Sequence, residues 1–190
     1  MDLLSGIFSA FGLSASAGLN AYIPLLVVAL LARFTNLMKL NPPWDALTSW
    51  WVIGLLLALS LIEFFADKVP VVNHANDLIQ TFVRPVAGAI IFAASAKVLT
   101  DVHPVVSLMI GLIVAGGVHV VKAAAVRPAV TATTGGAANI PVSVLEDFIS
   151  TIVSILSVVL PVLIGILVIL LVAWITWRLV GRTHQRPIRT

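Results

Sequence analysis

Long apolar runs separated by short polar segments make up most of the sequence. The first run, residues 3–33, exceeds the ~20 residues that cross a bilayer, and it carries polar and helix-breaking residues between Ser16 and Pro24. It therefore predicts a span that is broken near Asn20, since a break inside a membrane helix is tolerated where the released backbone groups find partners. The other apolar runs predict spans over residues 49–66, 84–100, 104–126 and 142–180, the last divided at Pro161.

The segments between these runs predict connections of different kinds. Residues 34–48 contain Pro42 and Pro43 and predict a loop. Residues 70–82 are too short and too polar to span, and they predict a half-helix or surface helix that begins at Pro70. Residues 131–139 are small and polar and predict an irregular stretch.

Composition indicates that the solvent around this chain is a bilayer. Of its 190 residues, 60% are hydrophobic and 10% are charged, and the mean hydropathy is +1.12, whereas soluble domains are about 25% charged. We therefore expect one integral membrane domain over residues 1–190, an all-α polytopic transmembrane helical bundle of five to six spans with broken or re-entrant helices. The sequence has no cysteine, which excludes disulfides, thiolate metal sites and cysteine nucleophiles.

Basic residues predict the side on which the C-terminus lies. Residues 181–190 form a basic tail, and its arginines predict a cytoplasmic C-terminus under the positive-inside rule. Five spans would place the N-terminus outside and six would place it inside. The distribution of lysine and arginine favours six, the lack of a loop before Pro161 favours five, and both arrangements stay open. No folded basic surface accompanies the tail, so nucleic acid is not an expected partner.

One stretch, residues 63–84, concentrates the polar chemistry of the chain. A charge at bilayer depth costs roughly 2.5–3.5 kcal/mol on insertion scales, so charges there mark pathways and sites. Glu63 and Asp67 are four residues apart and share a helix face. Two carboxylates in a low dielectric share a proton or hold a cation between them. The stretch contains Glu63, Asp67, Lys68, His74, Asp77 and Arg84.

A structural interpretation of the same stretch stays open beside the functional one. Lys68 would neutralise Asp67, Arg84 would pair with Asp77, and these ion pairs would hold the half-helix in place. His74 and Asp77 are three residues apart, a spacing that would suit two ligands of one metal ion. A zinc site needs three or four ligands, so Glu63, Asp67 or His119 would have to supply the others. We expect no cofactor, and the sequence leaves a metal unknown.

Two short patterns recur in the same order in the halves 1–100 and 101–180. Residues 11–20 resemble residues 110–119, and residues 70–81 resemble residues 141–151. Each half would then hold a glycine-broken span followed by a proline-started acidic helix, the order expected of an inverted repeat in a transporter. Asn20 and His119 would line the two helix breaks. The alternative is chance similarity among abundant apolar residues.

Several strings carry a resemblance to a known family. GLSASAGLNAYIPLL, EFFADKVP and RPVAGA, with the later TGG and ED, resemble a bacterial integral-membrane family, the domain-of-unknown-function 4126 family. The resemblance covers most of the chain and implies a multi-pass protein of the bacterial inner membrane, without a settled activity. Glu63 to Lys68 is also similar to the E-x-G-D-K motif of calcium/manganese-type cation exchangers, although here the acids are four apart and alanine replaces the glycine.

These observations predict a small membrane transporter, cation- or proton-coupled, and not an enzyme, since no hydrolase, zinc-protease or phosphate-loop motif occurs. A lipid or lipid-phosphate flippase or scramblase and a non-transporting membrane scaffold stay open as alternatives. Expected partners are membrane lipids, a small ion or solute, and a second copy in a homodimer. The predicted ion- or substrate-binding residues are Glu63, Asp67, Asn20, His119 and Asp77. The predicted gating or supporting residues are Lys68, Arg84, His74, Lys122, Arg127, Glu146 and Asp147.

Overall fold

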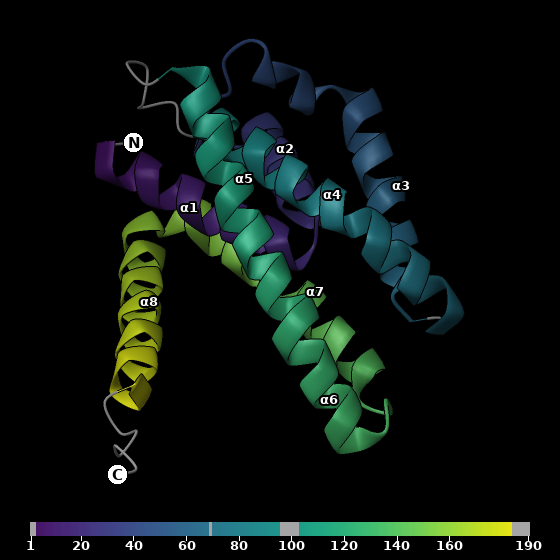
Figure 1. Cartoon of the computed structure of the whole chain (residues 1–190). Coiled ribbons are helices and arrows are strands. Elements are labelled where there is room, and N and C mark those ends of the chain that lie inside the picture. The colour runs from purple at the N-terminus through teal and green to yellow at the C-terminus, as the bar shows by residue number, and fades with distance from the viewer. Residues whose placement is uncertain (1–2, 69, 96–102, 184–190) are drawn as a thin grey trace.

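A computed structural model describes residues 3–68, 70–95 and 103–183, and every regular element among them is a helix. This confirms the predicted all-α bundle. Figure 1 shows α5 crossing the molecule and α8 standing to one side, joined to the rest at its first turns. The elements are α1 (Leu3–Leu19), α2 (Tyr22–Phe34), η1 (Trp44–Thr48), α3 (Trp50–Ala66), α4 (Pro70–Ser95), α5 (Pro104–Val121), η2 (Lys122–Val126), α6 (Arg127–Thr134), α7 (Asn139–Val159) and α8 (Pro161–Thr183).

The first apolar run is broken where the sequence predicts, between α1 and α2. Asn20 makes the break, and its side-chain Oδ1 accepts hydrogen bonds from the backbone N–H groups of Tyr22 at 3.1 Å and Ile23 at 3.0 Å. These are donors of the first turn of α2 that have no partner within the helix. The amide therefore allows the chain to begin a new helix without leaving these donors unsatisfied.

The prediction of a separate half-helix over 70–82 is wrong, because α4 runs from Pro70 to Ser95 with Pro85 inside it. A proline in a helix removes one backbone hydrogen bond and crowds the preceding turn, but membrane helices tolerate this where a neighbouring helix packs against them. α5 is that neighbour, and a Cβ added at Gly116 of α5 would lie 3.6 Å from Pro85 Cγ, so the two helices are close at this point. The loss at Pro85 is therefore local.

The predicted glycine break in the fourth span is also wrong. α5 stays α-helical through Gly116 and Gly117, and the irregular element is the π-helix η2, which begins at Lys122 and leads into α6. Since Pro128 in the first turn of α6 has no N–H to donate, the regular hydrogen-bond pattern is interrupted beside it. The helix continues to Thr134, so only residues 135–138 of the predicted irregular stretch form a turn.

The turn after α6 depends on glycine. Gly135 and Gly136 have φ angles of 62° and 89°, a region that side chains with a Cβ rarely adopt. α7 then begins at Asn139, two residues before the predicted proline start. α7 and α8 separate at Pro161, which confirms the predicted division of the last apolar run.

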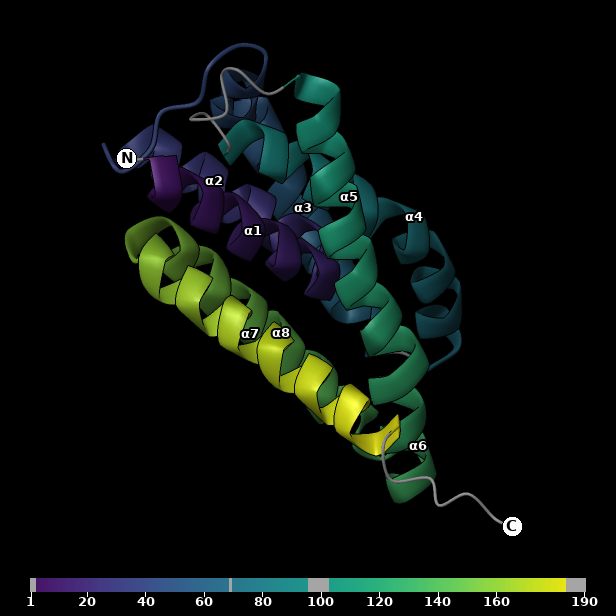
Figure 2. The ribbon, with the colours of Figure 1, turned by 60° about the vertical axis from the view of Figure 1, so that its left-hand side comes forward.

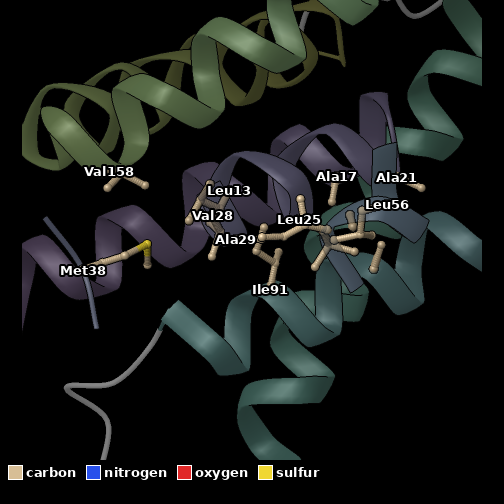
Figure 3. Packing of buried hydrophobic residues seen from close by; sticks show 13 residues of the cluster. Leu13, Ala17, Ala21, Leu25, Val28, Ala29, Met38, Leu56, Ile91 and Val158 are labelled. Atoms are coloured by element: carbon tan, nitrogen blue, oxygen red, sulfur yellow. The ribbon is translucent and has the colours of Figure 1, made fainter. Parts of the chain in front are cut away.

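The core lies between α1, α2, α4 and α5, where small residues allow the backbones to approach closely. Leu13, Leu25, Val28 and Ile91 are among its larger members, and Figure 3 shows them between α1, α2 and α4. Where α1, α4 and α5 meet, the Ser14 hydroxyl donates to the carbonyl oxygens of Gly88 at 3.2 Å and Gly111 at 2.9 Å. Small residues and hydroxyls of this kind are typical of helix contacts in membranes.

The distribution of side chains is that of a membrane protein. Large hydrophobic residues point outward from most helices, among them Leu55, Ile113 and Phe148, while serines, Asn20 and several charged residues are buried. In the part of the chain that the structure describes, three helical segments are long and apolar enough to cross a membrane, within Leu78–Ser95, Pro104–Thr134 and Asn139–Val159. Figure 2 shows the long α5–η2–α6 rod beside the other helices.

The contact between α4 and α5 yields a stability prediction. A methyl group on Gly111 would lie against the Gly88 carbonyl, 2.6 Å from Phe92 Cβ and 2.8 Å from Ala89 Cα. We expect Gly111→Ala to destabilise the fold by about 1–3 kcal/mol through overpacking. Gly117→Ala, in the same helix, is the matched control, because nothing lies within 4 Å of its added methyl. Unfolding in detergent would measure both, and equal stability of the two variants would contradict the close packing.

Candidate functional site

Charged side chains from both halves of the chain meet beside the break between α1 and α2. We call this group the charge network. Apart from Asn20 at the break, its members lie either at the end of α3 or in one of the three helical segments that are long and apolar enough to cross a membrane. Its members are Asn20, Glu63, Asp67, Lys68, Arg84, His119, Lys122, Arg127, Glu146 and Asp147, joined by ion pairs and hydrogen bonds.

The deepest part of the charge network is the pair of Glu63 and Arg84. Arg84 Nη2 lies 2.9 Å from Glu63 Oε1, and the two side chains are 1% and 0% exposed, so water does not screen the pair. The same nitrogen is 3.9 Å from Asp67 Oδ2. The guanidinium of Arg84 therefore faces both carboxylates. The shared proton or bound ion that the sequence predicts at Glu63 and Asp67 stays a prediction.

His119 lies beside this pair, and its two ring nitrogens have different roles. Nδ1 is 3.2 Å from Arg84 Nη1, and Nε2 is 3.2 Å from the Thr81 hydroxyl. A guanidinium only donates, so Nδ1 accepts and the imidazole is neutral with its proton on Nε2. Both ring nitrogens have hydrogen-bond partners, as expected of a hydrogen-bonded core histidine.

Asp67 connects four helical elements through its two oxygens. Oδ1 accepts from the Asn76 amide at 2.7 Å, and Oδ2 accepts from Arg127 and from the Ser143 hydroxyl, each at 3.3 Å. Burial raises the pKa of Asp67, but the positive charges of Lys122, Arg127 and Arg84, with the Asn76 hydrogen bond, outweigh burial and hold this pKa below its usual value. Asp67 is therefore an ionised hub between the deep pair and the outer residues.

The outer part of the charge network is centred on Glu146. Its Oε2 lies 2.7 Å from Lys122 Nζ and 3.8 Å from Arg127 Nη2. Lys122 Nζ also donates to the Leu19 carbonyl at 3.0 Å, which satisfies one acceptor at the end of α1. The side chains of Arg127 and Glu146 are 17% and 10% exposed, so this part is less enclosed than the Glu63–Arg84 pair.

A further ion pair links the two acidic segments of the chain. Lys68 Nζ lies 3.6 Å from Asp147 Oδ2, and Asn20 donates from Nδ2 to Asp147 Oδ1 at 3.0 Å. The predicted pairing of Lys68 with Asp67 is therefore wrong, because Asp147 is the acidic partner of Lys68. Asn20 supports the α2 backbone with its oxygen and Asp147 with its nitrogen, so the helix break and the charge network share one side chain.

The described charges of the network balance. Glu63, Asp67, Glu146 and Asp147 face an equal number of cationic groups, namely Lys68, Arg84, Lys122 and Arg127. No group of three histidine, aspartate or glutamate residues that could hold a metal ion occurs among the described residues. Each of these four carboxylates therefore lies beside at least one cation among the described residues.

Most of the predicted site residues are brought together, and some others lie outside the description. The side chains of His74 and Asp77 are outside the described residues, so the predicted pairing of Asp77 with Arg84 stays a prediction. Within the description, Arg84 pairs with Glu63. The sequence analysis did not identify Asn76, Thr81 and Ser143 as site residues. Neutral polar residues are common on helix faces, so nothing in the sequence distinguishes these three from others.

A row of serines on α7 was also missed, although its spacing carries a signal. Ser143, Ser150, Ser154 and Ser157 follow one face of the helix and are buried. Ser16 of α1 lies 2.8 Å from the hydroxyl oxygens of both Ser150 and Ser154. These contacts hold α7 against α1 just beyond Asp147 and fix the position of the acidic residues on α7.

Comparison with known proteins places the chain in a family. A family model described as a domain of unknown function (DUF4126) matches residues 7–181, so the chain belongs to this family, as the motifs in its sequence indicate. No curated protein and no solved structure matches the chain.

The deep pair yields a second stability prediction. Arg84→Gln leaves the buried Glu63 carboxylate without its cation, and we expect a loss of about 3–5 kcal/mol in the free energy of unfolding. Adding Glu63→Gln should restore part of this loss, because no uncompensated charge then remains at Glu63. Denaturant or thermal unfolding in detergent micelles would compare the single and double variants. A double variant as unstable as the single one would show that the pair is not coupled in this way.

Proposed function

We propose that this member of the family is a small proton-coupled membrane transporter, and that Glu63 takes the coupling proton. The observation that carries the proposal is a buried network of ion pairs beside the break between α1 and α2. Ionisable groups at membrane depth are expensive and are typical of proton relays and substrate pathways. Broken helices are typical of the binding sites of small transporters.

Glu63 is suited to this role because its partner has other acceptors. When Glu63 is protonated, Arg84 keeps His119 on Nη1 and can turn from Glu63 toward Asp67, which already lies 3.9 Å from its Nη2. Glu63 Oε2 is buried and has no hydrogen-bond partner among the described residues, so it is the oxygen that would take the proton. The charged and titratable groups around Glu63 are Tyr22 on α2, Arg84 on α4, His119 on α5, Lys122 in η2 and Asp67 at the end of α3.

The two irregular backbone positions supply the hinges for the proposed motion. α1 and α2 are separate helices joined at Asn20, and η2 interrupts the α5–α6 rod at Lys122. If Asp67 changed its ion-pair partner, the backbone at both positions would shift. Arg127, which pairs with Asp67, follows η2 directly, and Lys122 at the start of η2 donates to the end of α1. π-helical turns of this kind are frequent at functional sites.

The rest of the proposal concerns the cellular setting. We propose a multi-pass protein of the bacterial inner membrane with a cytoplasmic C-terminus, working as a homodimer among membrane lipids. A non-transporting scaffold is the competing function, and in it the charge network would only hold the helices together. The side chains of the network differ in burial: Arg84 is fully enclosed, and Arg127 is 17% exposed. This difference supports transport, since a pathway for protons must lead from the enclosed Glu63 to the outside.

Glu63→Gln tests the proposal in liposomes that contain a pH-sensitive dye. We expect the wild-type protein to carry protons down an imposed pH gradient in the presence of sodium phosphate or sodium succinate. Glu63→Gln should lower this flux by about 100-fold or more, the lower end of the range for losing a proton-transfer group. Its unfolding temperature should stay close to that of the wild type, since Arg84 keeps Asp67 and His119 as acceptors.

Asp45→Asn provides the matched control, because it makes the same carboxylate-to-amide change at an exposed position in η1, outside the charge network. Its flux should equal that of the wild type. Unchanged flux in a folded Glu63→Gln protein would remove Glu63 from the mechanism. Absence of flux in the wild type with every solute would favour the scaffold.

A further inference from the structure

We propose that a water molecule binds inside the bundle between Glu63, Gln80 and Arg84, and that it delivers the coupling proton to Glu63. This inference rests on the proposed function, because it names the group from which Glu63 takes its proton. The observation that carries it is a set of three buried polar atoms, one on each of these side chains, that have no hydrogen-bond partner among the described residues. They are Glu63 Oε2, Gln80 Oε1 and Arg84 Nε.

The burial of these three side chains makes a bound ligand necessary. Glu63, Gln80 and Arg84 are 1%, 2% and 0% exposed, so bulk water does not reach their polar atoms. A buried polar atom without a partner costs about 1–3 kcal/mol, and nearly all such atoms in native proteins are paired with protein groups or ordered water. Three of them on neighbouring side chains therefore point to a small polar ligand between them.

The stereochemistry of Arg84 places two of the three atoms on the same side of the ion pair. Nε and Nη2 donate from one edge of the planar guanidinium, the edge that can bind both oxygens of a carboxylate. Nη2 donates to Glu63 Oε1 at 2.9 Å, but neither Nε nor Oε2 has a partner in the described part of the chain. The pair is thus joined by one hydrogen bond instead of two. A water molecule completes it by accepting from Nε and donating to Oε2.

Gln80 supplies the third contact. It lies four residues before Arg84 on α4, so the two side chains share a helix face. The Gln80 side chain hydrogen-bonds the Tyr22 hydroxyl. Since Oε1 has no partner within the described structure, the amide nitrogen makes this bond, and Oε1 is the acceptor that faces the ion pair.

A neutral ligand with both donors and acceptors matches these three atoms. Water accepts from Arg84 Nε and donates to Glu63 Oε2 and Gln80 Oε1, about the usual number of hydrogen bonds for a buried water. A metal cation would meet the guanidinium as a like charge, and an anion would meet the Glu63 carboxylate in the same way. Like charges at such close range in a low dielectric repel strongly, so water is the ligand that the chemistry of the site favours.

The bound water is also placed to transfer the proton. An excess proton that reaches it forms a hydronium ion beside Glu63 Oε2. One O–H bond of the hydronium ion then breaks as the O–H bond at Oε2 forms, and a neutral water molecule stays in the site. Proton transfer through one positioned water is a common route to a buried acid or base.

Solid-state NMR of protein with ¹⁵N-labelled arginine in phosphatidylcholine bilayers tests the binding of water. Magnetisation transfer from water protons to Arg84 Nε reports a water molecule at that nitrogen, and we expect it in the wild type. The exposed Arg33 is the positive control. Arg84→Lys identifies the Arg84 signal by its loss, and assignment through the backbone identifies it if that variant does not fold. Transfer at Arg33 without transfer at Arg84 would overturn the proposal, because Nε would then bind Glu63 Oε2 directly.

Two variants assign the water to the three side chains. Gln80→Met keeps a side chain of similar length without an acceptor, and the transfer to Arg84 should be lost or greatly weakened. Tyr22→Phe is the matched control, because it removes the other hydrogen bond of Gln80 and leaves all three atoms in place, so the transfer should persist. Unchanged transfer in a folded Gln80→Met protein would place the water elsewhere and overturn this site. If Gln80→Met does not fold, the wild-type measurement decides alone.

Proton flux in liposomes separates this inference from the proposed function. Gln80→Met should lower the flux, but by less than the loss of about 100-fold expected for Glu63→Gln. Flux that depends on Glu63, without water at Arg84, would leave the proposed function standing and overturn the inference. Water at Arg84 with unchanged flux in Gln80→Met would keep the water site and overturn its role as the proton donor. Water at Arg84 with unchanged flux in Glu63→Gln would remove the proton role of Glu63 itself.

Discussion

The Glu63–Arg84 pair is the interaction on which the rest of this structure depends. Its two side chains are almost completely removed from solvent, so an ionised Glu63 is not tolerable without the guanidinium of Arg84. Arg84 reaches Glu63 from α4, and the same guanidinium contacts His119 of α5 and Asp67 at the end of α3. These three helices are thereby fixed relative to one another at a depth where lipid offers no hydrophobic force between helices. The outer ion pairs extend from Asp67 and add α7 to the same assembly.

The sequence predicts the helical elements well where the pattern of apolar residues is interrupted by a polar side chain. Asn20 marks the break between α1 and α2, and Ser49 begins α3 with its side chain as an N-cap. Prolines and glycines were less reliable guides. Pro85 lies inside a continuous helix, and Gly116 and Gly117 lie in regular α-helix, because packing against a neighbouring helix decides whether such a residue ends the element. Local sequence does not contain that neighbour.

The candidate site shows the same limit for side chains. Charge at membrane depth identified nearly every member of the network, since the expense of burial makes each charged residue noticeable in an apolar chain. The partners could not be assigned in the same way. Lys68 stands next to Asp67 in the chain but pairs with Asp147, and Arg84 pairs with Glu63 although other acids are as near in sequence. Which ions meet is set by the crossing of helices, and neutral partners such as Asn76 and Ser143 carry no comparable signal.

The break at Asn20 has an electrostatic consequence of its own. Each α-helix has a dipole, with about half a positive charge at its N-terminus and half a negative charge at its C-terminus. At the break, the negative pole of α1 and the positive pole of α2 lie only a few residues apart, and the side-chain oxygen Oδ1 of Asn20 accepts from the first N–H groups at the positive pole. The pole that faces the ion pairs is therefore the negative end of α1, and the Lys122 ammonium meets it at the Leu19 carbonyl. The backbone of the first helix thus contributes to the charge of the site as a fractional anion that no pH change can neutralise.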